Sequence, residues 1–241
     1  GLSVETGLPT RAVKTQRYSL GGAGNVANNL LAMGVGSVSV YGVTGADPFG
    51  YQMRQLMGAA GMKVDGLLEQ NGDWVTHTYI KPLEAGVEAN RIDFGNFNRL
   101  ADSVARQLAE KLADDCADLD LVIINQQVAD GIHRSALFQE QLQTVVAARP
   151  DKIFLLDSRD MSGRYAGAVR KINAYEAMLL MGADVEPRDL ISLDDARTAA
   201  GKLASEWRKP VFISRGDRGC LVANEGRIDT VPGLHIVAQT D

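Results

Sequence analysis

Cysteine and histidine are scarce in this sequence of 241 residues, and each scarcity excludes a class of site. The two cysteines, Cys116 and Cys220, lack the spacing of metal ligands. The sequence therefore predicts neither a disulfide framework nor a zinc centre, and it indicates a reduced compartment, with the cytoplasm as the expected location. The three histidines share no spacing that indicates a metal site or a catalytic triad, so we assign them no chemistry.

Long apolar runs and an excess of basic residues are also missing. No run approaches the ~20 apolar residues that cross a bilayer as a helix, and the first residues show no signal-peptide pattern. The net charge of −5 argues against nucleic acid or an anionic membrane surface as the main partner. With 45% hydrophobic residues the chain can form one main domain, so we expect a globular protein in solution.

Strand and helix patterns alternate along most of the chain. The predicted core strands are residues 37–43, 121–124, 153–156, 168–172 and 210–213. Several of them are apolar along their whole length, which is typical of parallel strands buried on both faces between helices. The predicted fold class is therefore α/β, a doubly wound and mostly parallel sheet flanked by helices.

Two segments depart from this alternation. Residues 8–20 are polar with interleaved β-formers, which predicts an exposed strand. Residues 74–94 show short strand patterns separated by loops with glycine and proline. We expect these two segments to form a small β-sheet lid on an α/β core of residues 21–73 and 95–241.

A glycine-rich stretch, Gly21-Gly22-Ala23-Gly24-Asn25, comes directly before a predicted helix. Glycines let the backbone approach a ligand, and Asn25 is expected to cap the helix and to offer its amide to hydroxyl groups. Gly22-x-Gly24-x-x-Ala27 also matches a dinucleotide fingerprint, which needs a buried strand just before it. Residues 14–17 are too polar for such a strand, so an NAD-dependent Rossmann-type oxidoreductase is the alternative rather than the main hypothesis.

Four motifs in order resemble those of the ribokinase-like carbohydrate kinases of the phosphofructokinase B type. They are Gly21–Ala27, Gly45–Gly50, Asn173–Glu176 and Ser214–Gly219. The resemblance covers essentially the whole chain and implies an ATP-dependent kinase that transfers the γ-phosphoryl group of MgATP to a hydroxyl group of a sugar or sugar phosphate. In that family the β insertion is a lid over the sugar, and we expect a homodimer through it.

Within the family the chain looks most like the heptose 7-phosphate kinases, because of its first five residues and the segment Arg91-Ile92-Asp93. It departs from them at residues 125–131, where those enzymes carry an Asp and a Lys, so the resemblance does not extend to the choice of sugar. The family also has a strand before the lid and a Gly-Ala-Gly-Asp motif that supplies the catalytic base. We expect the chain to be trimmed at both ends, with the base just after Asp241 and none among these residues.

The resemblance also implies roles for single residues. Gly21, Gly22, Asn25 and Arg91 would bind the sugar; Asn173, Ser214, Arg215, Gly216 and Gly219 would meet the nucleotide phosphates; and Glu176 would hold Mg²⁺ through water. Asp157 ends a predicted parallel strand, where ligands collect in such sheets, and is a further candidate for the sugar.

Each of these roles has a structural alternative. Asn173 and Glu176 also fit a helix capping box. Arg215 and Gly216 fit a hairpin turn with a solvated charge, and Asp157 can cap a loop. A non-catalytic module that binds sugar or nucleotide on the same fold is the second alternative to the kinase.

Overall fold

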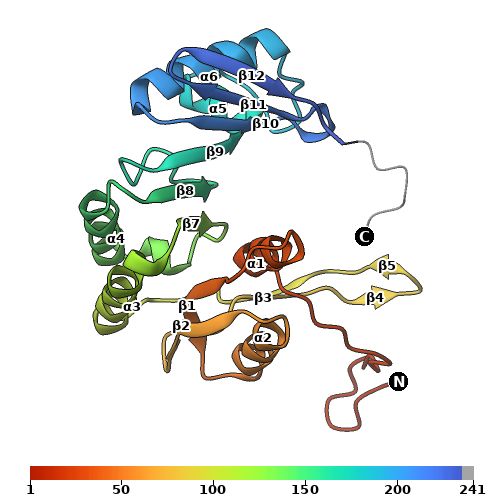
Figure 1. Ribbon diagram of the computed structural model, residues 1–241. Coiled ribbons are helices and arrows are strands. Elements are labelled where there is room, and N and C mark those ends of the chain that lie inside the picture. Colours follow the sequence, from red (N-terminus) through yellow and green to blue (C-terminus); the bar gives the residue numbers. More distant parts are fainter. Residues whose placement is uncertain (235–241) are drawn as a thin grey trace.

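The structure is a computed structural model of the 241-residue chain, and it describes residues 1–234. Its main sheet has the strand order β12-β11-β10-β9-β8-β7 (Figure 1). The parallel strands are β7 (Leu121–Gln126), β8 (Ile153–Ser158), β9 (Val169–Asn173) and β10 (Val211–Ser214). The antiparallel strands β11 (Cys220–Asn224) and β12 (Arg227–Val231) complete it. The predicted α/β class with a mostly parallel sheet is confirmed.

One face of this sheet is covered by helices. They are α3 (Asp102–Asp115), α4 (Ala136–Ala148), α5 (Ala174–Leu180) and α6 (Leu193–Trp207). The strand residues that pair across the ladder, Ile124, Leu156 and Val211 among them, are buried beneath these helices. The apolar residues of these helices recur at helical spacing and face the sheet. α4 buries Phe138 and Leu142, and α6 buries a row of alanines that lets it approach the strands closely.

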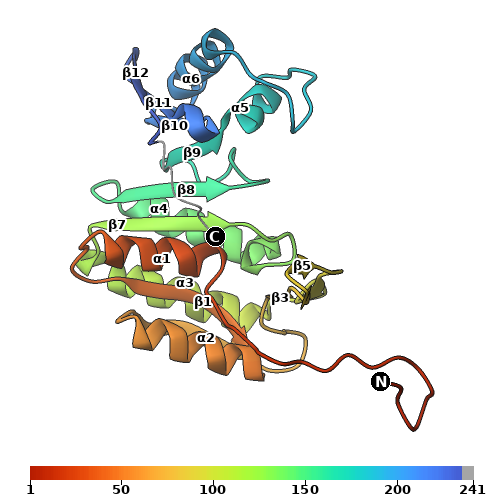
Figure 2. The same ribbon diagram turned by 90° about the vertical axis from the view of Figure 1, so that its right-hand side faces the viewer.

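The opposite face of the same strands is more open. Its apolar residues Ile123, Leu155, Val169 and Phe212 are only half-buried. In the part of the chain that the structure describes, α1 (Gly22–Ala32) is the helix that reaches this face, at β7 (Figure 2). Burial on both faces, which the apolar strands predict, is therefore incomplete within residues 1–234.

A second, two-stranded parallel sheet carries the N-terminal part of the core. β1 (Ser39–Gly45) pairs with β2 (Lys63–Gln70), while α1 and α2 (Pro48–Ala59) pack on one side of it. Tyr41 and Val43 of β1 contact the core beneath α3 on the other side. β2 is a full core strand that was not predicted from the sequence, because charged or polar residues stand at four of its eight positions.

The segment predicted as a lid, residues 74–94, contains two short antiparallel pairs that project from the core (Figure 1). They are β3 (Thr78–Ile80) with β6 (Ile92–Phe94), and β4 (Leu83–Glu84) with β5 (Val87–Glu88). The strand predicted over residues 8–20 is wrong, since residues 10–20 join no ladder and the segment has a single bridge, Leu2 to Pro9. Nearly all its side chains are exposed, so it buries no apolar face that would hold it to the lid.

No helix within residues 1–234 is long and apolar enough to cross a membrane.

Candidate active site

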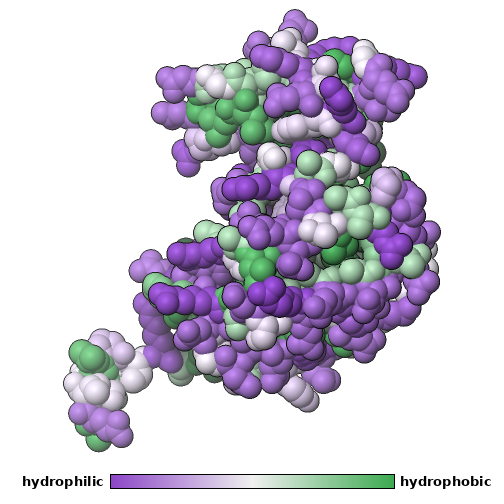
Figure 3. All heavy atoms as spheres, turned by 90° about the vertical axis from the view of Figure 1, so that its left-hand side faces the viewer, coloured by the Kyte–Doolittle hydropathy of each residue, from purple (hydrophilic) through white to green (hydrophobic). Residues whose placement is uncertain are grey.

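The carboxyl ends of the parallel strands lie on the side of the molecule from which the lid projects (Figure 2). The space-filling surface is hollowed between the part that carries α5 and α6 and the part that carries the lid (Figure 3). In open parallel sheets, ligands bind outside the carboxyl ends of the strands. The predicted site residues can therefore be sought along this edge.

The glycine loop brings the start of α1 to the end of β7. Gly21 is the N-cap, and Gly22 has a φ of 46°, the left-handed conformation that favours glycine. A Cβ atom added at Gly22 would lie 4.0 Å from Oδ1 of Asn125. At Gly24 an added Cβ would lie 3.0 Å from Leu20 Cβ, so this glycine permits the close contact between helix and preceding chain. The exposed Gly21 and Gly22 are thus held beside Asn125.

Asn25 does not cap the helix, contrary to the expectation from its position. The helix begins three residues earlier, at Gly22, and its N-cap makes no side-chain hydrogen bond. A turn between the Gly24 N–H and the Gly21 carbonyl, 3.0 Å apart, starts the helix instead. Asn25 is exposed on the first turn of α1, where its amide can meet a ligand.

Three polar residues form a row across the sheet at this edge. Asn125 of β7 pairs with Asp157 of β8, and Asp157 pairs with Lys171 of β9, so their side chains lie on the same face. The Lys171 Nζ atom donates to Asp157 Oδ1 at 3.2 Å and to Oδ2 at 3.3 Å. Asp157 is therefore a member of an ion pair that faces solvent at the sheet edge, rather than the cap of a loop.

Asn173 and Glu176 form the capping box that the sequence offered as their structural alternative. Asn173 Oδ1 accepts from the Glu176 N–H, and Glu176 Oε2 accepts from the Asn173 N–H, both at 2.8 Å. Burial raises the pKa of Glu176, while the nearby Lys171 opposes the rise and Asp157 adds to it. These charge effects place Glu176 close to the Asp157–Lys171 pair, so capping and ligand binding can coexist.

The glycine turn after β10, residues 215–219, lies next to Asn173 and Glu176. Ser214 pairs with Asn173 across the ladder, and its Oγ atom donates to the Ile172 carbonyl at 3.4 Å. Gly216 and Gly219 both adopt positive φ, of 62° and 86°. At Gly219 a side chain would collide with the backbone carbonyl of Val231, so this position requires glycine.

Arg215 is buried, which differs from the solvated charge of the turn hypothesis. Its backbone N–H donates to the Gly219 carbonyl at 2.8 Å and closes the turn. Within the described residues its Nε atom has no hydrogen-bond partner. A buried guanidinium nitrogen without a partner is costly, and a bound anion would satisfy it.

Arg91 lies apart from these residues. Its Nε and Nη2 atoms donate to the two carboxylate oxygens of Asp93 at 2.6 and 2.7 Å, and its guanidinium stacks 4.2 Å from the Tyr79 ring centroid. All these contacts stay within the lid sheet. The structure therefore does not join Arg91 to the row at the strand ends, and a sugar contact from Arg91 would depend on the position of the lid.

The motif Gly45–Gly50 fixes the base of the lid. Asp47 Oδ1 accepts from the Gly50 N–H and Oδ2 from the Thr76 N–H, both at 2.8 Å. The Gly45 N–H donates to Thr76 Oγ1 at 2.9 Å. A Cβ at Gly45 would lie 2.9 Å from the Trp74 carbonyl, so the first glycine allows lid and core to touch. The motif is therefore a structural joint between the lid and the core.

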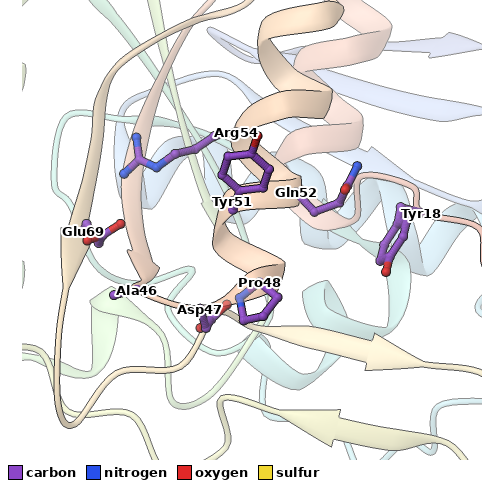
Figure 4. Close-up of a pocket in the computed structure, with 8 residues that line it drawn as sticks. All are labelled: Tyr18, Ala46, Asp47, Pro48, Tyr51, Gln52, Arg54 and Glu69. Carbon is purple, nitrogen blue, oxygen red and sulfur yellow. The ribbon is translucent and has the colours of Figure 1, made fainter.

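A cavity of about 550 Å³ opens beside this joint, at the start of α2 (Figure 4). It is lined by Tyr18, Ala46, Asp47, Pro48, Tyr51, Gln52, Arg54 and Glu69. Two of its charged groups already have partners, since the Arg54 guanidinium donates to the Leu67 carbonyl and the Asp47 carboxylate holds the joint. None of the predicted sugar or nucleotide residues lines it, so we assign it no chemistry.

Sequence reasoning missed four residues at the strand ends: Gln126, Ser158, Arg159 and Lys171. Gln126 Oε1 accepts from Ser158 Oγ at 2.8 Å and from the Arg159 N–H at 3.1 Å, which ties the loops after β7 and β8 together. Arg159 and Lys171 add positive charge near Glu176. Polar residues at the ends of otherwise apolar strands were a signal for Gln126, Ser158 and Arg159, as for Asp157, whereas Lys171 lies within β9 and had no such signal.

The residues at this edge fit magnesium and a nucleotide by their chemistry. Mg²⁺ is usually held through one or two carboxylates together with waters and substrate phosphates, and Asp157 and Glu176 supply two carboxylates. Within residues 1–234 no group of three or more His, Cys, Asp or Glu side chains could hold a metal by itself. The base expected after Asp241, like Asp241 itself, lies outside the described residues.

Comparison with known proteins shows which family the chain matches. The model of the pfkB family carbohydrate kinases matches residues 4–241. The chain is 29% identical over 191 residues to the bifunctional protein HldE of Hydrogenovibrio crunogenus, which covers 79% of this chain and 38% of that protein. It is 30% identical over 115 residues to the D-beta-D-heptose 7-phosphate kinase of Bordetella bronchiseptica, which covers 45% of this chain and 36% of that enzyme.

The fold is also similar to that of a solved kinase. Phosphofructokinase-2 from Escherichia coli, in complex with fructose-6-phosphate, matches with a TM-score of 0.65 and 19% identity over 91% of this chain and 70% of its own. At this identity the likeness concerns the fold alone. The chain spans less than half the length of the HldE protein it matches.

Proposed function

The chain belongs to the pfkB family of carbohydrate kinases, and we propose that it transfers the γ-phosphoryl group of MgATP to a hydroxyl group of a sugar or sugar phosphate. The family match, together with the likeness to HldE proteins and a heptose 7-phosphate kinase, confirms the resemblance that the four motifs carry. The donor, the metal and the acceptor are the parts of the proposal that go beyond the family.

One observation carries the proposal. The glycine loop of α1 and the glycine turn after β10 lie at opposite ends of one polar row, which runs from Asn125 through Asp157 and Lys171 to the Asn173–Ser214 pair. Phosphoryl transfer needs a sugar and a nucleotide held in line, with little further covalent chemistry from the protein. The polar row could hold a sugar at the glycine loop of α1 and the nucleotide phosphates at the glycine turn after β10, which is the arrangement that this transfer needs.

The residues at one end of the row would bind the sugar, and those at the other end would bind the nucleotide phosphates. Gly21, Gly22 and Asn25 would bind sugar hydroxyls through backbone groups and one amide. At the other end Arg215 has a buried donor to offer a phosphate oxygen, and Gly216 and Gly219 let the backbone approach the phosphates, with Ser214 and Asn173 beside them. Bound Mg²⁺ would neutralise phosphate charge, and Glu176 would hold one of its waters.

The two alternatives are less well supported. A dinucleotide site needs a buried strand directly before its glycines, and residues 10–20 form no strand. A non-catalytic binding module would share the geometry but would not transfer phosphate, so only an activity assay separates it from a kinase.

We extend the proposal to assembly and location. Residues 74–94 would act as the lid, with residues 8–20 as an extended segment beside it, where Arg11 lies 4.0 Å from Glu84 of β4. The exposed Val75, Tyr79 and Ile92 would pair with a second copy as a homodimer. Cys116 and Cys220 are both free thiols, which supports a cytoplasmic protein.

Ligand-dependent melting of the natural full-length protein tests the nucleotide. A ligand that binds the folded state raises the melting temperature, by an amount that grows with concentration over Kd. MgATP and MgADP should raise it, whereas NADH should leave it unchanged. Stabilisation by NADH without stabilisation by MgATP would contradict the proposal and favour the oxidoreductase.

A further inference from the structure

Lys171 is a cation in the middle of the polar row, and no sequence motif singled it out. It lies on β9, paired with Asp157 of β8 on one side and with Phe212 of β10 on the other. Two residues further along β9, Asn173 begins the segment that leads to Glu176. Lys171 is therefore placed between the sugar end, at Asn125 and Gly22, and the nucleotide end, at Ser214.

The side chain is held but not enclosed. Its Nζ atom lies 3.2 Å from one Asp157 oxygen and 3.3 Å from the other, and the aspartate side chain is 23% exposed. The lysine side chain is 42% exposed, so one carboxylate uses part of the ammonium group and the rest faces the open side of the sheet. An ammonium group has three donors, and the directions away from Asp157 can still meet an anion.

A surface ion pair alone does not explain this arrangement. Exposed pairs contribute little to stability, about 0–1 kcal/mol. Here the pair sits at the strand ends, where Arg159 also brings positive charge near Glu176. Four charged side chains, two of each sign, gather at the place where a nucleotide phosphate and a sugar hydroxyl would meet.

Building on the proposed function, we propose that Lys171 binds the phosphoryl group in transfer and that Asp157 positions its ammonium group for this task. In the reaction, the bond between the γ-phosphorus and the oxygen bridging to the β-phosphorus breaks, and a bond from the sugar hydroxyl oxygen to the same phosphorus forms. ADP leaves with the bridging electron pair, and the hydroxyl proton passes to a base. Lys171 exchanges no proton; its charge stabilises the equatorial phosphoryl oxygens.

The test compares nucleotide affinities of the natural full-length protein without sugar. Lys171→Met should weaken MgATP binding about tenfold, the effect of losing one charged hydrogen bond. Binding of MgADP, which lacks the γ-phosphate, should change much less. Lys202→Met, at an exposed position on α6, is the matched control and should bind both nucleotides as wild type does. Equal loss for MgATP and MgADP, or no loss, would overturn the proposal.

Two further variants separate phosphate binding from a purely structural ion pair. These variants are compared with ATP in the absence of Mg²⁺, because Asp157 is also one of the two carboxylates that fit the metal. If Lys171 only neutralises Asp157, then Asp157→Asn combined with Lys171→Met should restore ATP affinity. If Lys171 binds phosphate, the double variant should remain as weak as Lys171→Met, and Lys171→Arg should recover part of the affinity. Restoration in the double variant would refute the proposal.

Failure of the kinase proposal gives a different pattern. A wild-type protein that neither binds MgATP nor transfers phosphate would overturn the proposed function together with this inference. If the wild-type protein is a kinase and Lys171→Met binds MgATP and MgADP with the same affinity ratio as wild type, only the inference about Lys171 is overturned.

Discussion

Replacing Glu176 by Gln separates metal binding from helix capping. In the capping box, Glu176 Oε2 accepts from the Asn173 N–H at 2.8 Å. The amide oxygen of Gln can accept the same hydrogen bond, whereas the negative charge that attracts hydrated Mg²⁺ is lost. The substitution therefore keeps the structural contact and removes the proposed function.

The expected change in stability is small. Loss of a whole helix cap costs about 0.5–2 kcal/mol, and here Asn173 Oδ1 still accepts from the backbone at position 176. Burial raises the pKa of Glu176, so its ionised form carries a desolvation cost that Gln avoids. The melting temperature at neutral pH should stay within about 2 °C of wild type, since 1 kcal/mol corresponds to roughly 2–4 °C in a chain of this size.

The pH dependence of stability has a defined sign. Because the pKa of Glu176 is raised in the folded state, the folded protein binds this proton more tightly than the unfolded chain does. The resulting contribution to the free energy of unfolding is fully present below the ordinary pKa of 4.5. That contribution is lost as pH rises through the raised pKa. Glu176→Gln should remove this part of the pH dependence.

Activity should respond much more strongly than stability. Residues that act on a metal through an outer shell typically account for 10–100-fold in metal affinity or activity. The assay is phosphoryl transfer by the full-length protein across a series of Mg²⁺ concentrations, in which Glu176→Gln should need at least about tenfold more Mg²⁺. Glu206→Gln, at an exposed position on α6, is the matched control. An unchanged Mg²⁺ requirement with a melting temperature several degrees lower would refute the metal role.

Three other substitutions test the joint, the buried histidine and the lid. Gly45→Ala would clash with the Asp47 carboxylate and should lower the free energy of unfolding in urea by about 1–3 kcal/mol, whereas Gly58→Ala, in open space on α2, should not lower it. Burial lowers the pKa of His133 to about 4 from 6.5, so stability should fall as pH drops through that window, and His133→Gln should abolish the dependence; equal slopes would contradict this. Ile92, 52% exposed, should carry the dimer, so Ile92→Lys should give monomers by light scattering while the wild type stays dimeric; a wild-type monomer at all concentrations would exclude the dimer.

The elements of the fold could be predicted where one apolar period dominates. α4 and α6 pack with the faces that their spacing predicts, because a helix with a single apolar stripe has one way to bury it. β2 was missed as a core strand because charged or polar residues stand at four of its eight positions, and such a strand resembles an exposed one in sequence. The strand predicted at residues 8–20 rested on β-formers alone, and without a buried face they do not specify pairing.

The motifs of the candidate site could be predicted from the sequence, but the contacts and burial of its charged side chains could not. Asn173 and Glu176 are local partners, so their capping box is visible in sequence. Lys171 lies 14 residues from Asp157 and meets it only through the register of β8 and β9. The burial of Arg215 also depends on distant packing, so the sequence pattern suggested a solvated turn instead.

Transfer of labelled γ-phosphate from MgATP to a panel of sugars and sugar phosphates, by the natural full-length protein, tests the central claim most directly. The wild-type protein should give a labelled sugar phosphate and an equal amount of ADP for at least one acceptor, with the yield reduced in Glu176→Gln and unchanged in Glu206→Gln. MgATP binding without transfer to any acceptor would contradict it and identify a binding module.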